Sequence, residues 1–140
     1  VAFHGRASDF CFDHPEYAIG LKGVELPDTE TLSDKYPFDY NLPEVRAERF
    51  RIIEELLTNY PTDGIELDWF TFKPVCSPGS VDGFRNVLTG WMGEIRETAE
   101  RAAREQGREK TIAVRVPAIW EGCWDQGFDL KQWFENGIID

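Results

Sequence analysis

The sequence predicts an α/β fold built from parallel β/α units, and we expect it to be a fragment of a (β/α)8 TIM barrel. Continuous apolar strands alternate with amphipathic helices, which is typical of a parallel sheet covered by helices. No GxGxxG or GxxxxGK[ST] motif follows a strand, so the usual sign of a nucleotide-binding open sheet is missing. A complete barrel needs about 250 residues, and this chain has 140.

We expect residues 1–140 to form one partial barrel domain, roughly half of the barrel, that is truncated at both ends. The chain lacks an initiator Met and ends on Ile138-Ile139-Asp140, where a strand would begin. Half a barrel cannot close its sheet. The expected partner is therefore the remainder of the same barrel, outside this chain.

The first third of the chain predicts a strand end, a long irregular region and a helix. Residues 1–6 have the strand pattern, and residues 8–40 are rich in Asp, Pro, Gly and Tyr. Loops of that length inside a compact domain tend to be functional. The helix is expected from Asn41, because Asn41-Leu42-Pro43-Glu44 has the form of a capping box and apolar residues follow at helical spacing as far as Tyr60.

The middle of the chain predicts a strand and a long helix. Pro61-Thr62-Asp63-Gly64 ends the preceding helix and leads into a strand from Ile65 to about Phe70. A long helix is expected because its apolar residues form one stripe. Ser80 precedes its start and Gly107 ends it. That stripe consists of Phe84, Val87, Leu88, Trp91, Met92, Ile95, Ala99 and Ala102.

The last third predicts two more strands separated by a short helix. Thr111 to Val116 is a strand closed by Pro117, and a loop follows from Ala118 to Phe128. Asp129 caps the short helix, which Gly137 ends, and Ile138-Ile139-Asp140 starts the next strand.

Composition narrows the class of ligand. The chain has 26 acidic and 15 basic residues and a net charge of −11, which argues against nucleic acid or an anionic membrane as a partner. No apolar run reaches the roughly 20 residues of a membrane span, and no signal peptide is visible. We expect a soluble protein of unknown compartment. The three widely spaced cysteines do not predict a zinc site.

The most informative segment is Asp63-Gly64-Ile65-Glu66-Leu67-Asp68-Trp69. Side chains alternate along a strand, so the carboxylates of Glu66 and Asp68 are expected on one face, about 7 Å apart. Ile65, Leu67 and Trp69 share the other face. Because burying two ionised carboxylates is costly, such a pair usually meets a substrate, a metal or a cation.

The stretch from Phe38 to Trp69 resembles the glycoside-hydrolase-like barrel proteins loosely called family 10 glycosyl hydrolase-like. Other blocks agree in order: Phe3-His4-Gly5-Arg6 with Asp9, His14-Pro15-Glu16-Tyr17, Arg115-Val116-Pro117, and Gly127-Phe128-Asp129 with Trp133 and Gly137-Ile138-Ile139-Asp140. The resemblance implies a barrel with a carbohydrate as substrate. The strand is also similar to the chitinase signature DGxDxDxE, but Phe70 stands where that signature has its catalytic acid.

We expect Asp68 and Glu66 to be the catalytic residues, because active sites of barrels form at the carboxyl ends of strands. One acid would transfer the proton while the other stays ionised. Arg115 is expected to pair with one of them, either contacting substrate or only supporting the acids as an ion pair. If Arg115 and Arg6 merely neutralise the two acids, the cluster does no chemistry.

Further substrate-binding residues are expected around the acids. His4, Arg6 and Asp9 follow the first strand, although a strand histidine is more often a core residue than a catalyst. Trp69, Trp120 and Trp124 lie at strand ends or in the following loops, as do Phe70 and Phe72, where aromatic faces can stack on sugar rings. Trp91 and Trp133 sit at helical core spacing and are expected to be packing residues.

The sequence therefore favours a glycoside hydrolase that acts on an oligo- or polysaccharide by carboxylate acid/base catalysis, with no cofactor. Two alternatives stay open. The first is a non-catalytic carbohydrate-binding barrel module. The second is a Mg²⁺-dependent lyase or isomerase of the enolase-like barrel type, with the metal bound by Asp9, Glu66 and Asp68.

Overall fold

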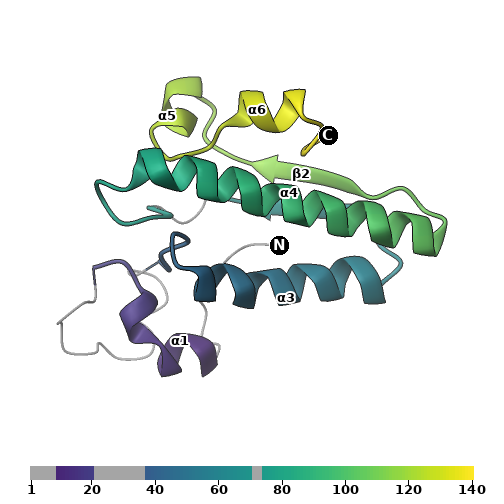
Figure 1. Cartoon of the computed structure of the whole chain (residues 1–140), viewed down its shortest axis with the longest axis horizontal. Helices are drawn as coiled ribbons and strands as arrows, with labels where there is room; N and C mark the ends of the chain where they lie inside the picture. Colours follow the sequence, from purple (N-terminus) through teal and green to yellow (C-terminus); the bar gives the residue numbers. More distant parts are fainter. Residues whose placement is uncertain (1–8, 21–36, 71–73) are drawn as a thin grey trace.

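The computed structural model describes residues 9–20, 37–70 and 74–140. Helical turns, helices and two strands follow one another along these residues (Figure 1). Their order is α1 (Asp9–Asp13), the 3-10 turn η1 (Pro15–Tyr17), α3 (Pro43–Asn59), β1 (Gly64–Asp68), α4 (Val81–Gln106), β2 (Thr111–Arg115), α5 (Trp120–Trp124) and α6 (Leu130–Glu135).

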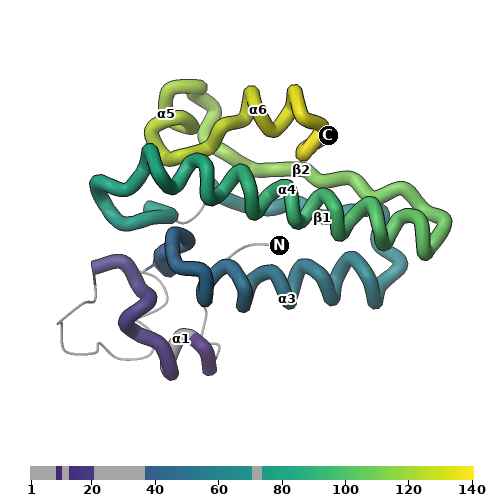
Figure 2. Tube along the Cα trace, in the orientation of Figure 1, coloured from purple at the N-terminus to yellow at the C-terminus, as the bar shows by residue number. Residues whose placement is uncertain are grey.

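The two strands form one small parallel sheet. They pair from Gly64 opposite Thr111 to Asp68 opposite Arg115, and α4 connects them as the crossover of a single β-α-β unit. The chain trace in Figure 2 shows α3 and α4 side by side with both running from left to right, whereas β2 runs back along α4. The carboxyl ends of the strands therefore lie near the amino-terminal ends of these helices.

The expected TIM-barrel fragment is wrong. The described residues contain two strands in one sheet rather than a series of β/α units. Ile138 to Asp140, expected to begin a strand, forms no strand, because only Asp140 reaches β2, with its N–H donating to the Ile112 carbonyl at 3.1 Å. The strand expected in residues 1–6 lies outside the described residues.

The hydrophobic core lies between the sheet and the helices. Leu67 and Ile112, from the apolar faces of β1 and β2, are fully buried, as the alternation along the strands predicts. The core is completed by large side chains from the helices and loops: Ile53, Leu57, Phe84, Leu88, Met92, Ile95, Phe128 and Trp133.

The long helix α4 confirms its sequence prediction. Ser80 is its N-cap, and Gly107 ends it in the left-handed conformation at φ 62°, which glycine adopts at little cost. Seven of the eight predicted stripe residues are buried, and Val87 is partly buried. Trp91 and Trp133 are buried as expected, and the indole N–H of Trp133 donates to Thr89 Oγ1 at 2.9 Å.

The predicted capping box of α3 is wrong. Leu42 is the N-cap, and the helix begins with Pro43 without a side-chain cap. Asn41 instead lies in a turn, where its backbone N–H donates to Asp39 Oδ1 at 2.9 Å. A proline at the first helical position needs no acceptor, so α3 starts without the box.

The short helix α6 does begin as predicted. The carboxylate of Asp129 accepts the Gln132 N–H at 3.0 Å, and the chain after α6 turns back to β2. There the carboxylate of Asp140 accepts the Ile112 N–H at 2.8 Å and pairs with Arg96 at 2.6 Å. Burial alone would raise the pKa of Asp140, but these two contacts outweigh it and lower that pKa.

A polar cluster joins α3 and α4 at the amino-terminal end of the sheet. Lys110 is buried, and its ammonium donates to Thr62 O and Gln106 Oε1, both at 2.7 Å. The amide of Gln106 donates to Leu57 O at 3.0 Å and Thr58 O at 2.9 Å, the carbonyls at the end of α3. The cluster satisfies carbonyls that a helix end leaves without an intrahelical donor.

Lys110→Met is expected to lower the free energy of unfolding by about 2 kcal/mol, because hydrogen bonds from a charged donor are lost and their acceptors stay buried. Urea denaturation measures the change. Lys131→Met is the matched control, since the Lys131 ammonium is exposed and lies 3.9 Å from Glu135; it should change stability by less than about 0.5 kcal/mol. Equal effects of the two substitutions would contradict the role of Lys110.

No helix within the described ranges combines the length and the apolar character that a membrane crossing requires.

Candidate functional site

Glu66, Asp68 and Arg115 lie together on the face of the sheet opposite the apolar one, and we call these three residues the acidic face. Glu66 and Asp68 are two positions apart on β1, so alternation puts their side chains on one side. Arg115 ends β2 directly opposite Asp68. The parallel register therefore brings one guanidinium to both carboxylates.

The contacts within the acidic face are unequal. Arg115 Nη2 donates to Glu66 Oε1 at 2.6 Å, whereas Arg115 Nη1 lies 3.6 Å from Asp68 Oδ2. The Asp68 side chain is 10% exposed, against 49% for Glu66 and 56% for Arg115. Asp68 Oδ1 also accepts the Phe70 N–H at 2.9 Å. Asp68 is the carboxylate with the more fixed position, and Glu66 is the more accessible one.

Arg115 was expected to pair with Glu66 or Asp68, and the structure places it against both. The pairing spans β1 and β2, so it also holds the two strands in register. A salt bridge exposed to this degree contributes about 0–1 kcal/mol to stability. Because this contribution to stability is small, the ion pair alone does not explain why two acids share this face.

Aromatic side chains flank the carboxyl ends of the strands. Phe70 follows β1 and is exposed, and Trp120 and Trp124 of α5 are 54% and 46% exposed. Arg85 covers one side of Trp124, with its guanidinium carbon 3.7 Å from the ring centroid and Nη2 donating to the Trp124 carbonyl at 3.0 Å. A ligand can reach the indole of Trp124 only on the sides that Arg85 leaves open. Sequence reasoning missed Arg85.

Trp69 lies in the core and not in the site. It is 1% exposed, and its ring centroid is 5.2 Å from that of Tyr40 and 6.0 Å from those of Trp91 and Phe128. The alternation that turns Asp68 to the acidic face turns Trp69 to the apolar one. The expected stacking of a sugar on Trp69 is not supported by this position.

The remaining predicted residues do not join the acidic face. Asp9 is the first residue of α1, which lies apart from β2 in Figure 1, with α3 between them in that view. His4, Arg6 and Phe72 lie outside the described residues. In the described part of the chain, no three His, Cys, Asp or Glu side chains gather as a metal site, so the structure does not bring Asp9 together with Glu66 and Asp68.

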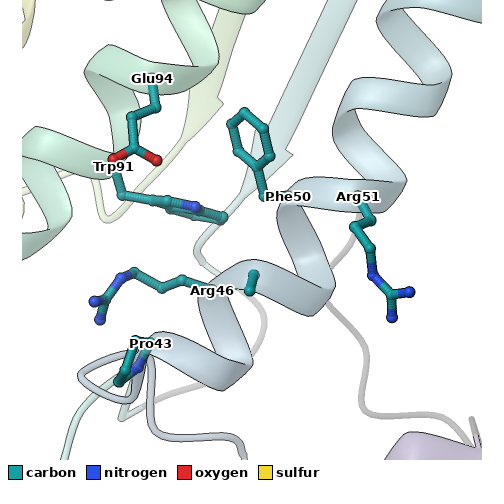
Figure 3. Close-up of a pocket in the computed structure, with 7 residues that line it drawn as sticks. Pro43, Arg46, Phe50, Arg51, Trp91 and Glu94 are labelled. Carbon is teal, nitrogen blue, oxygen red and sulfur yellow. The ribbon is translucent and has the colours of Figure 1, made fainter.

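A separate pocket of about 430 Å³ opens between α3 and α4. Figure 3 shows Arg46 and Phe50 of α3 near the indole of Trp91, with Glu94 above the indole and Arg51 directed away from it. Arg46 Nη1 donates to the Tyr40 carbonyl at 2.7 Å. Burial lowers the pKa of Arg46, an effect that Glu94 opposes. The pocket lies on the helical side of the molecule, away from the acidic face.

Taken together, the fold and the site define a small parallel α/β protein with a carboxylate–guanidinium cluster at its strand ends. No protein-family model matches the chain, and no curated protein matches it in sequence.

Proposed function

We propose that the protein binds an oligo- or polysaccharide at the acidic face and hydrolyses a glycosidic bond with the carboxylates of Glu66 and Asp68. The observation that carries the proposal is their placement on one sheet face at the carboxyl end of β1, where the Glu66 side chain is 49% exposed and the Asp68 side chain 10%. Glycosidases act with two carboxyl groups that flank the scissile bond. The sequence resemblance to the glycoside-hydrolase-like proteins implies the same substrate class, although the barrel that it also implied is wrong.

The contacts of the two acids suit different roles. Asp68, fixed by the Phe70 N–H, is proposed to donate its proton to the leaving oxygen and then, as the carboxylate, to take a proton from the water that attacks the sugar carbon, since a general acid needs a defined position. Glu66, beside Arg115 at 2.6 Å, is proposed to supply the negative charge that stabilises the oxocarbenium-like transition state. Trp120 and Phe70 offer exposed rings for a sugar.

A non-catalytic carbohydrate-binding site is the second candidate. One observation favours it: Arg115 reaches both carboxylates and can neutralise them as a purely structural cluster. In that case the exposed aromatic rings still bind sugar, but no bond is cleaved.

The proposal is tested by screening an oligosaccharide panel for release of reducing ends and for binding by calorimetry. We expect Asp68→Asn to lower kcat/KM about 100-fold and Glu66→Gln to lower it at least tenfold. Trp120→Ala should raise KM more than it lowers kcat, because stacking contributes to binding.

Glu97→Gln is the matched control, since Glu97 is an exposed acid on α4, and it should retain wild-type activity. Equal turnover by the wild type, Asp68→Asn and Glu66→Gln would contradict the catalytic assignment. Binding without turnover would favour the second candidate, and loss of activity with EDTA would favour a metal-dependent reaction.

A further inference from the structure

Arg49 is a charged residue within the core of the protein. It lies on the buried side of α3 between Val45 and Ile53, both fully buried, and is itself 8% exposed. Four-residue spacing puts these three side chains on one face of the helix. The sequence therefore directs a guanidinium into apolar surroundings.

Among the described residues, the groups in contact with the Arg49 guanidinium carry no negative charge. Its guanidinium carbon lies 5.5 Å from the centroid of the Phe38 ring, and the phenol of Tyr40 is beside it. Burial raises the pKa of Tyr40 despite the opposing effect of Arg49, so this phenol stays neutral. Across residues 9–20, 37–70 and 74–140, no carboxylate forms a salt bridge with Arg49.

Two of the guanidinium nitrogens are buried without an acceptor. These are Nε and Nη2, whose N–H groups form one edge of the planar group and point the same way. That edge is the fork that binds the two oxygens of a carboxylate or phosphate. Arg46, three residues earlier, differs: it donates to the Tyr40 carbonyl and has Glu94 nearby. Figure 3 shows Arg46 and Glu94 lining the same pocket.

We propose that Arg49 is an oxyanion-binding residue whose Nε and Nη2 hold the two oxygens of a small anion. A guanidinium cannot lose its proton to escape burial, and a buried charge without a counter-charge is strongly unfavourable. A bound oxyanion removes both deficits, because it supplies the charge and accepts both N–H groups. The site is independent of the acidic face and does not rest on the proposed hydrolase activity.

The test is thermal unfolding of the whole chain in acetate, in phosphate and in sulfate, with ionic strength held constant by chloride. We expect Tm to rise with at least one of the three in proportion to ln(1 + [anion]/Kd), by about 4 °C at ten times its Kd. Such a rise in acetate alone identifies a carboxylate ligand, and such a rise in phosphate or sulfate identifies an inorganic or phosphorylated one. A wild-type Tm that none of the anions changes would overturn the proposal.

Variants assign the effect to the fork of Arg49. Arg49→Met should abolish the rise in Tm, and Arg49→Lys should weaken it at least tenfold in Kd, since the charge remains but the fork is lost. Arg51→Met is the matched control, because Arg51 is exposed on the same helix and paired with Glu48; it should respond as the wild type does. An undiminished rise in Arg49→Met would contradict the assignment.

A measurement on the wild type covers the case in which Arg49→Met does not fold. The ¹⁵N NMR signal of the Arg49 Nε–H should shift with anion concentration, reach half of its full shift at the Kd obtained from Tm, and saturate above it. The Nε–H signals of exposed arginines such as Arg104 should shift without saturating. An Arg49 signal that does not respond to any of the three anions would overturn the proposal.

Discussion

Gly64→Ala is expected to remove most of the stability of the protein, by more than about 4 kcal/mol. Gly64 begins β1 with φ at 147°, and a Cβ added there would lie 2.0 Å from the carbonyl oxygen of Thr111. The clashing atom belongs to the backbone of Thr111, so it cannot rotate away as a side chain could. Since Thr111 N–H donates to Asp63 O at 2.8 Å just beside it, the strands would have to separate where their pairing begins.

The expected result is a protein that is unfolded or has lost its cooperative urea transition, measured by circular dichroism. Gly90→Ala is the matched control, because Gly90 lies inside α4 and an added Cβ would meet nothing within 4 Å. That change should stabilise the protein by about 0.5–1 kcal/mol. A Gly64→Ala variant as stable as the wild type would contradict the close approach of the strands.

Local structure is the part of the fold that the sequence predicts well. The apolar stripe of α4 follows from the spacing of its apolar residues at the helical period. The end of the helix at Gly107 follows from the preference of glycine for the left-handed conformation. The bounds of β2 differ by one residue from the prediction. The spacing of apolar residues and the residues that end a helix are local features of the sequence, so a short segment is enough to predict them.

The number and pairing of strands could not be predicted in the same way. The barrel was inferred from repetition of the strand and helix pattern, but a short apolar run such as Ile138-Ile139 forms a strand only if a neighbour pairs along its length. Here, within the described residues, Asp140 alone hydrogen-bonds to β2, through its N–H and its carboxylate. Pairing depends on long-range geometry, which a local pattern does not contain.

The candidate site was predicted in part, for the same reason. Alternation along β1 correctly separates Glu66 and Asp68 from the apolar face. Arg115 has the expected carboxylate partners, but its side chain is 56% exposed, so the cost of burial that suggested them does not apply. The burial of Arg49 was missed because its charge conceals its place in the stripe with Val45 and Ile53. Four-residue spacing from Val45 passes through position 49, so this signal was present in the sequence.

Trp69→Ala is expected to lower the free energy of unfolding by about 3–5 kcal/mol. The indole is 1% exposed and contacts rings from three different elements: Tyr40 before α3, Trp91 of α4 and Phe128 before α6. Its removal leaves a cavity at the junction of these elements, and one side chain cannot relax to fill it. Urea denaturation followed by circular dichroism measures the loss.

Trp120→Ala is the comparison for Trp69→Ala, because it distinguishes the effect of a buried indole on stability from the effect of an exposed indole on sugar binding. Trp120 is an indole of the same size but is 54% exposed on α5, so its removal should cost less than about 1 kcal/mol. If the acidic face binds sugar, Trp120→Ala weakens binding while stability is kept, whereas Trp69→Ala loses stability first. The reverse pattern would place the functional indole in the core, and it would contradict the division that alternation makes between Asp68 and Trp69.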